Sequence, residues 1–147
     1  MILLSYNVRG VGGTPNLISL KRLFGRIKPD IVLLQETICL GEKACETFLK
    51  ILLGWEVCAL DGSGLSGGLV AIWNHLVDDL KPFPFCARML LVGRLRGMEV
   101  DIKIANCYAP FLGRLEFWNQ VRSSGIFSNP RLIFCGDLNF TLGATDI

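Results

Sequence analysis

Most of this sequence consists of short apolar runs, each followed by polar residues or glycine. This pattern limits what the chain can fold into. Three of these runs, taken with the polar residues that follow, are Leu3–Asn7, Ile31–Glu36 and Leu132–Asp137. Apolar runs of about four to eight residues bounded by turn residues are typical of buried β-strands. The chain has 147 residues, so we expect one domain over residues 1–147 with these strands in its core.

A helical pattern lies between the first two of these strands, because large apolar residues recur at helical spacing from Leu17 to Ile27. We expect Thr14 to cap the N-terminus of this helix, Pro15 to take its first position and Pro29 to end it. A strand, a helix and a second strand in this order predict a βαβ unit.

The rest of the chain continues the alternation of strands and helices. Further strands are predicted at 55–60, 69–73, 89–94 and 100–105, and helices at 45–53 and 115–121. The strands 89–94 and 100–105 form a predicted hairpin around Gly97. The fold class that follows is α/β (α+β), with mixed β-structure and flanking helices.

Residue usage excludes several classes of site. No apolar stretch approaches the roughly 18 residues of a membrane span. Gly62–Gly67 has the spacing G-x-G-x-x-G, but a strand-like segment follows it where a dinucleotide site requires a helix. The single histidine, His75, and six cysteines without a CxxC pair argue against structural zinc. We therefore expect no membrane association and no nucleotide cofactor, and we interpret His75 as a surface or turn residue.

Polar residues that could perform chemistry follow several of the predicted strands. They are Asn7, Glu36, Tyr108, Asp137 and Asn139. In layered α/β folds the ends of strands meet at one rim, where ligand sites gather, although a single carboxylate after a strand is commonly a cap or a turn residue. Glu36 and Asp137 carry hard oxygen ligands of the kind that Mg²⁺ prefers. A carboxylate-bound metal with neutral donors around it is suited to phosphoryl transfer.

Five segments in this order resemble the motifs of the endonuclease/exonuclease/phosphatase superfamily. They are Ser5–Gly10, Pro29–Thr37, Gly67–Ile72, Asn106–Pro110 and Gly136–Asn139. Within that superfamily, Asn7-Val8-Arg9-Gly10 and Leu34-Gln35-Glu36-Thr37 are most similar to plant LINE-type (non-LTR) retrotransposon endonucleases. Many DNA-cleaving relatives have an acid where this chain has Arg9, and retroelement sequences often show this change.

The resemblance implies a fold and a set of roles. The fold would be a partial two-sheet β-sandwich flanked by helices, with DNase-I-like architecture. Glu36 would bind Mg²⁺, with Mn²⁺ as the alternative ion, and Asn7 would help to place the metal and the scissile phosphate. Tyr108 would hydrogen-bond the phosphate, and Asn139 would stabilise the pentavalent transition state. Asp137 would position or activate the attacking water, or protonate the leaving group.

The same resemblance implies DNA as the substrate of the parent domain and an intracellular location, with the nucleus expected for a retroelement enzyme. The family ends its site with a Ser-Asp-His motif, which has no counterpart here because no histidine follows Asp146. We therefore expect this chain to be the N-terminal portion of the domain. Three readings stay open: a metal-dependent endonuclease, a catalytically inactive retroelement remnant, or a small-molecule phosphatase acting on inositol phosphates.

Overall fold

The computed structural model describes residues 1–61, 67–74, 79–85 and 88–139 of the chain. The predictions for most of the Gly62–Gly67 segment, for His75 and for Asp146 lie outside these residues. Within the described part, no helix is long and apolar enough to cross a membrane.

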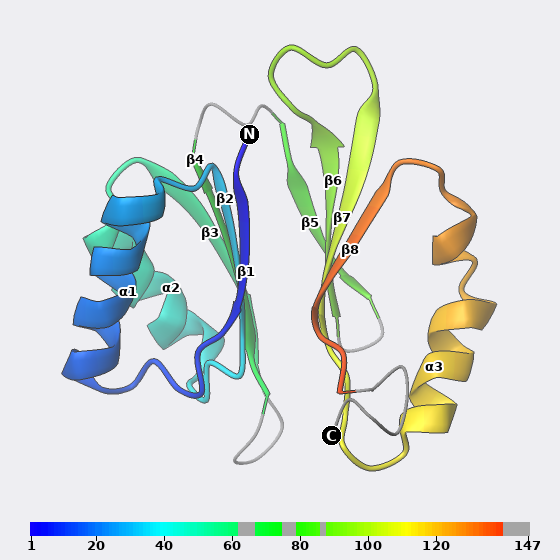
Figure 1. The fold of residues 1–147 in the computed structure, drawn as a ribbon, viewed down its shortest axis with the longest axis horizontal. Helices are drawn as coiled ribbons and strands as arrows, with labels where there is room; N and C mark the ends of the chain where they lie inside the picture. The colour runs from blue at the N-terminus through cyan, green and yellow to red at the C-terminus, as the bar shows by residue number, and fades with distance from the viewer. Residues whose placement is uncertain (62–66, 75–78, 86–87, 140–147) are drawn as a thin grey trace.

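Two four-stranded sheets face each other, and helices cover their outer sides (Figure 1). The first sheet has the order β1-β2-β4-β3 and consists of β1 (Leu3–Asn7), β2 (Ile31–Gln35), β3 (Trp55–Leu60) and β4 (Leu69–Asn74). The second has the order β5-β6-β7-β8 and consists of β5 (Lys81–Phe85), β6 (Arg88–Arg94), β7 (Asp101–Tyr108) and β8 (Leu132–Asp137). The outer elements are α1 (Thr14–Ile27) and α2 (Gly41–Ile51) on the first sheet, and α3 (Arg114–Ser123) and the 3-10 helix η1 (Ile126–Ser128) on the second. This arrangement confirms the predicted fold class.

Each sheet contains one parallel pair of strands, and all other neighbours are antiparallel. Strands β1 and β2 are joined through α1, and β7 and β8 through α3, so each pair belongs to a βαβ unit. The pairs are in register at their C-terminal ends, where Asn7 lies opposite Gln35 and Tyr108 lies opposite Asp137. Across the sandwich, β1 contacts β8 and β2 contacts β7. The ends of four strands therefore meet at one rim.

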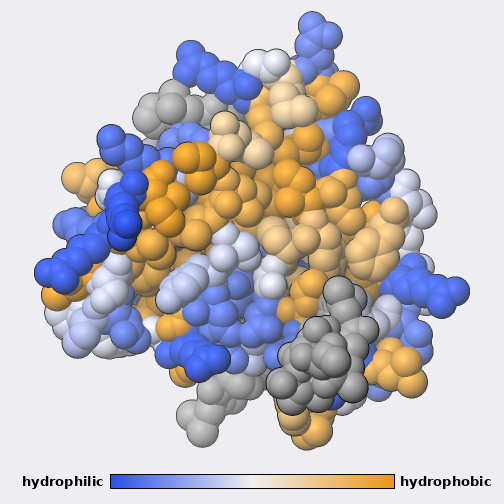
Figure 2. All heavy atoms as spheres, in the orientation of Figure 1, coloured by the Kyte–Doolittle hydropathy of each residue, from blue (hydrophilic) through white to orange (hydrophobic). Residues whose placement is uncertain are grey.

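Apolar side chains fill three layers. One cluster lies between the sheets and includes Ile31 and Leu33 of β2 and Ile102 and Ile104 of β7. The other two clusters lie between the first sheet and its helices and between the second sheet and α3. Figure 2 shows apolar side chains across the middle of the molecule and hydrophilic ones below them, towards the ends of β1 and β8 in Figure 1.

Several element boundaries and one whole strand differ from the sequence predictions. Gly13, not Thr14, is the N-cap of α1, and no side chain caps this helix. Helix α2 begins at Gly41, four residues before the predicted 45. Strand β7 extends to Tyr108 instead of stopping at 105, because pairing with β6 and β8 continues. Strand β5 was not predicted, because Pro82 and Pro84 weaken a strand pattern; β5 lies at an edge of its sheet, where proline is tolerated.

Candidate active site

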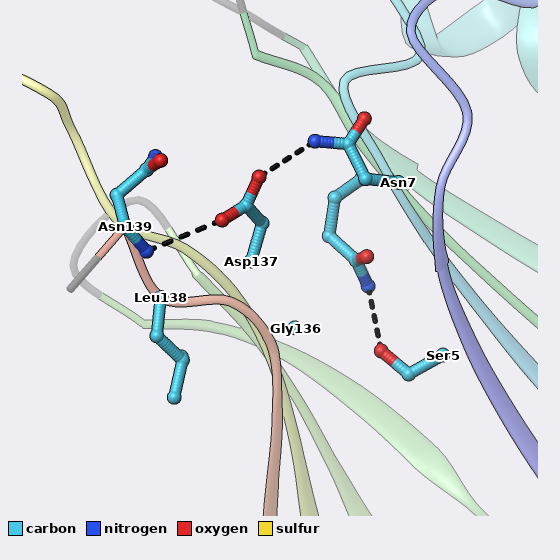
Figure 3. A pocket seen from close by; sticks show the side chains of 7 residues that line it. Ser5, Asn7, Gly136, Asp137, Leu138 and Asn139 are labelled. Atoms are coloured by element: carbon cyan, nitrogen blue, oxygen red, sulfur yellow. Dashed lines mark hydrogen bonds between the residues drawn. The ribbon is translucent and has the colours of Figure 1, made fainter. Parts of the chain in front are cut away.

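Two of the hydrogen bonds between the sheets lie at the C-terminal ends of their parallel strands. At the ends of the two inner strands β2 and β7, Tyr108 Oη donates to Glu36 Oε1 over 2.5 Å, and we call this contact the central crossing. At the ends of the two edge strands β1 and β8, Asn7 Nδ2 donates to Asp137 Oδ2 over 2.7 Å, and we call this contact the edge crossing (Figure 3). The two crossings bring four of the predicted site residues together.

Asn139 joins this group from the loop that follows β8. Its N–H donates to Asp137 Oδ1 over 3.2 Å, and its Nδ2 donates to the Ala109 carbonyl over 2.6 Å. The Arg114 guanidinium donates to the Asn139 carbonyl over 2.9 Å, which ties this loop to the start of α3. All five residues singled out from the sequence therefore lie around one rim.

The edge crossing holds its two side chains in a fixed orientation. Asn7 Oδ1 accepts a hydrogen bond from the Arg9 N–H over 3.1 Å, so both ends of the Asn7 amide are engaged. Asp137 accepts from Asn7 at one carboxylate oxygen and from the Asn139 N–H at the other. Figure 3 shows the carboxylate between these two donors. The arrangement leaves little freedom for the Asp137 carboxylate to rotate.

The backbone at the site is unusual for residues other than glycine. Glu36 has φ +53° and Asn139 has φ +47°, both in the left-handed region. At Glu36, the Gly10 N–H donates to its carbonyl over 2.7 Å, which extends the parallel pairing beyond β1 and β2. Backbone conformations of this kind persist only where the surroundings enforce them, and they cluster at functional sites.

Two motif glycines are required by close packing. Gly136 has φ +134°, and a Cβ there would lie 1.8 Å from the Cys107 carbonyl oxygen. Gly68 has φ +84°, and a Cβ there would lie 2.3 Å from Thr37 Oγ1. A side chain at Gly136 would displace Cys107, the residue that precedes Tyr108, and a side chain at Gly68 would displace Thr37, the residue that follows Glu36.

Two carboxylates set the electrostatics around Tyr108. Donation to Glu36 is the main cause that raises the pKa of the Tyr108 phenol to about 12, and burial and the charges of Glu36 and Asp137 act in the same direction. The Asn139 side chain also hydrogen-bonds the phenol and acts the other way on its pKa. Tyr108 therefore keeps its proton at neutral pH and can act as a hydrogen-bond donor.

A cleft of about 420 Å³ opens at the edge crossing. Its walls are Ser5, Asn7, Gln35 and residues 136–139 (Figure 3). This volume lies within the usual range of small-ligand pockets, about 300–1,000 Å³. Among the residues that the structure describes, no group of three or more His, Cys, Asp or Glu side chains could hold a metal ion by itself.

Gln35 and Asn106 belong to two of the five motifs, but no role in the site was predicted for them from the sequence. The structure buries both between the sheets, directly beneath the central crossing. The sequence contains a signal for this burial, because side chains two residues apart in a strand share a face. Asn106 falls on the inward face with Ile102 and Ile104, and Gln35 falls on the inward face with Ile31 and Leu33. A buried amide at the end of an apolar series must find a hydrogen-bond partner.

Solved structures of longer proteins have a similar fold. An AP endonuclease from Archaeoglobus fulgidus matches with a TM-score of 0.72 and 20% identity over 100% of this chain and 61% of that chain. The 3′ phosphatase NExo from Neisseria, bound to a product DNA hairpin, matches with a TM-score of 0.69 and 16% identity over 98% of this chain and 60% of that one. TDP2 from C. elegans matches with a TM-score of 0.61 and 18% identity over 95% of this chain and 48% of that one. This chain thus spans about half to three fifths of their lengths.

A comparison with curated protein sequences gives no significant match. The sequence profile described as the Endonuclease/Exonuclease/phosphatase family matches residues 4–147, which is almost the whole chain. With the two-sheet fold and the five motifs gathered at one rim, this match shows that the chain belongs to the endonuclease/exonuclease/phosphatase family.

Proposed function

We propose that this chain carries the phosphodiester-cleaving site of a magnesium-dependent endonuclease that acts on DNA. The observation that carries the proposal is the meeting of Asn7, Glu36, Tyr108, Asp137 and Asn139 at one rim through the central and edge crossings. The DNA-processing proteins of similar fold support DNA as the substrate class.

The donor set fits a magnesium ion. Mg²⁺ in phosphoryl-transfer sites is commonly held by one or two carboxylates, with waters and substrate phosphates completing its shell. Glu36 and Asp137 both act on the Tyr108 phenol, so two carboxylates face one small region. We assign Glu36 and the Asn7 amide as the residues that would hold Mg²⁺, and Mn²⁺ accepts similar oxygen ligands. When bound, the ion would offset the charge that develops on the phosphate oxygens.

The chain's own residues would bind and orient the substrate. The Tyr108 phenol is protonated at neutral pH and would donate a hydrogen bond to a phosphate oxygen. The Asn139 amide lies beside the same phenol and would add a second neutral donor where negative charge develops. Asp137, held by Asn7 and the Asn139 N–H, would orient or deprotonate the attacking water, or protonate the leaving oxygen.

Nicking of supercoiled plasmid tests this function. The assay compares the unchanged chain with Glu36→Gln, with Mg²⁺ and with chelator. Glu56→Gln is the matched control, because Glu56 is an exposed glutamate in β3 that pairs with Trp73 near the opposite end of the first sheet. We expect Mg²⁺-dependent nicking that falls by about 100-fold or more in Glu36→Gln, because a positioned group of this kind contributes on that scale. Equal nicking by Glu36→Gln and the unchanged chain, or nicking that resists chelator, would refute the assignment.

We also propose that the domain derives from a LINE-type retrotransposon. The support is the residue sequence of two motifs, Asn7-Val8-Arg9-Gly10 and Leu34-Gln35-Glu36-Thr37. Sequencing the genomic region around the coding sequence tests this origin. A neighbouring reverse-transcriptase reading frame is the expected result, and a conserved host gene structure without one would count against it.

A further inference from the structure

Two buried amides meet between the sheets beneath the site. Gln35 at the end of β2 is 1% exposed, and Asn106 in β7 is 0% exposed. Gln35 Nε2 donates to Asn106 Oδ1 over 2.7 Å, so this bond runs from one sheet to the other. It lies between the apolar cluster of the sandwich and the central crossing.

Further hydrogen bonds run from this pair to the first sheet. Asn106 Nδ2 donates to the carbonyls of Leu34 and Val70, each over 3.2 Å, and these two residues are paired neighbours in β2 and β4. Gln35 Nε2 also donates to Ser5 Oγ of β1 over 3.2 Å, a bond drawn in Figure 3. The amide pair therefore ties β7 to three adjacent strands of the opposite sheet.

Apolar contacts and amide contacts restrain the sheets differently. Apolar packing is not directional, so small sliding movements of two apolar faces change its free energy gradually. A hydrogen bond has a narrow range of distance and angle, and a buried amide that loses its partner is destabilising. The Gln35–Asn106 network is therefore satisfied in one relative placement of β2 and β7, and it penalises others.

The central crossing depends on that placement. Glu36 follows Gln35 directly, and Tyr108 lies two residues after Asn106 on the same face of β7. We propose that Gln35 and Asn106 are positioning residues, which hold β2 against β7 so that the Tyr108 hydroxyl and the Glu36 carboxylate meet. The contact itself is independent of any reaction, whereas its catalytic consequence rests on the proposed function.

Fluorine NMR can report this contact without any activity. The chain has two tyrosines, so 3-fluorotyrosine labelling gives signals from Tyr6 and Tyr108 alone. Tyr108→Phe assigns the two signals, and Glu36→Gln shows where the Tyr108 signal lies when its acceptor is changed. Tyr6 is 47% exposed and lies in the edge strand β1, and it serves as the internal reference.

The decisive variant is the double substitution Gln35→Met/Asn106→Leu, which replaces both amides with apolar side chains of similar size. Removing both partners of a buried hydrogen bond in this way can leave stability nearly unchanged. We expect a folded protein in which the Tyr108 signal moves or broadens while the Tyr6 signal stays. If the double variant does not fold, Gln35→Asn takes its place: it should move the Tyr108 signal, and adding Asn106→Gln should restore it.

Leu91→Ala is the control for destabilisation alone, because Leu91 is fully buried in the apolar cluster and makes no bond to the amides. Its Tyr108 signal should stay in place. An unchanged Tyr108 signal in the folded double variant would overturn the proposal, and so would an equal change in Leu91→Ala. In the nicking assay, kcat of the double variant should fall by about 100-fold, the scale expected for a misplacement of about 1 Å, with a smaller change in KM. Absence of nicking by the unchanged chain counts against the proposed function, and the fluorine signals still decide the positioning role.

Discussion

The central and edge crossings join the same two sheets with different structural support. Glu36 follows β2, which lies between β1 and β4, and Tyr108 ends β7, which lies between β6 and β8. Both strands therefore have a hydrogen-bonded partner strand on each side. Asn7 and Asp137 end β1 and β8, which have one partner strand each. All five residues of β2 are buried, whereas Ile133 in β8 remains 36% exposed.

This difference shows that one site can be positioned in two ways. The central crossing is supported on its core side by packed strands and by the buried amides of Gln35 and Asn106. The edge crossing is held by local backbone geometry: the Arg9 N–H on Asn7, the Asn139 N–H on Asp137, and the close approach at Gly136. Changes to burial should therefore affect the central strands most, and changes to the backbone should affect the edge strands most.

Gly136→Ala should have the largest effect and should break the edge crossing. Its Cβ would overlap the Cys107 carbonyl oxygen, and alanine disfavours φ +134°. We expect a loss of about 4 kcal/mol or more in the free energy of unfolding, measured by urea denaturation. Gly12→Ala is the control, because a Cβ there meets nothing within 4 Å. Similar stabilities for the two variants would show that β7 and β8 can separate without penalty.

Leu33→Ala and Leu3→Ala sharpen the comparison between inner and edge strands. Both leucines contribute to the cluster between the sheets, but Leu33 is fully buried in β2 and Leu3 is partly buried in β1. We expect losses of about 2–5 kcal/mol for Leu33→Ala and about 1 kcal/mol for Leu3→Ala. Denaturant midpoints would measure both, and a larger loss for Leu3→Ala would contradict the distinction.

Tyr108→Phe removes the donor of the central crossing and keeps the ring. In the proposed reaction kcat should fall by about 100-fold, the scale for one positioned donor. The free energy of unfolding should change by less than about 1 kcal/mol, because the site is open to water, which can solvate Glu36. Nicking kinetics and denaturation measure the two effects separately. A variant with full activity would remove Tyr108 from the proposed mechanism.

The comparison with the smallest effect at neutral pH concerns two thiols, Cys107 in the inner strand β7 and Cys135 in the edge strand β8. Burial raises the pKa of each from 9.0 to about 11. A raised thiol pKa means that folding favours the neutral form, so this contribution to stability is complete below pH 9 and is lost as the pH rises through about 11.

Cys107→Ala should therefore flatten the fall in stability between pH 9 and pH 11 that the unchanged chain shows. Thermal unfolding across this range measures the slope. Cys135→Ala provides the edge-strand comparison, and an unchanged slope in both variants would contradict a contribution from either thiol.

Much of the fold was predictable from the sequence because its signals are local. Short apolar runs located the inner strands, and apolar residues at helical spacing located α1. The unpredicted strand β5 shows where local signals fail, because Pro82 and Pro84 argue against a strand and only pairing with β6 forms it. The N-cap at Gly13 in place of Thr14 has the same origin, since the path of the preceding loop decides which residue starts the helix.

The sequence by itself determined the family, through five ordered motifs, and the identity of the residues that could perform chemistry. It could also place them at strand ends, since the strand pattern and the polar residue that follows are neighbours in the chain. Only the tertiary structure decided which of them touch. Asn7 and Asp137 lie 130 positions apart, and Gln35 and Asn106 lie 71 apart. Contacts over such separations depend on how two sheets pack, and that packing is a property of all their inward-facing side chains together.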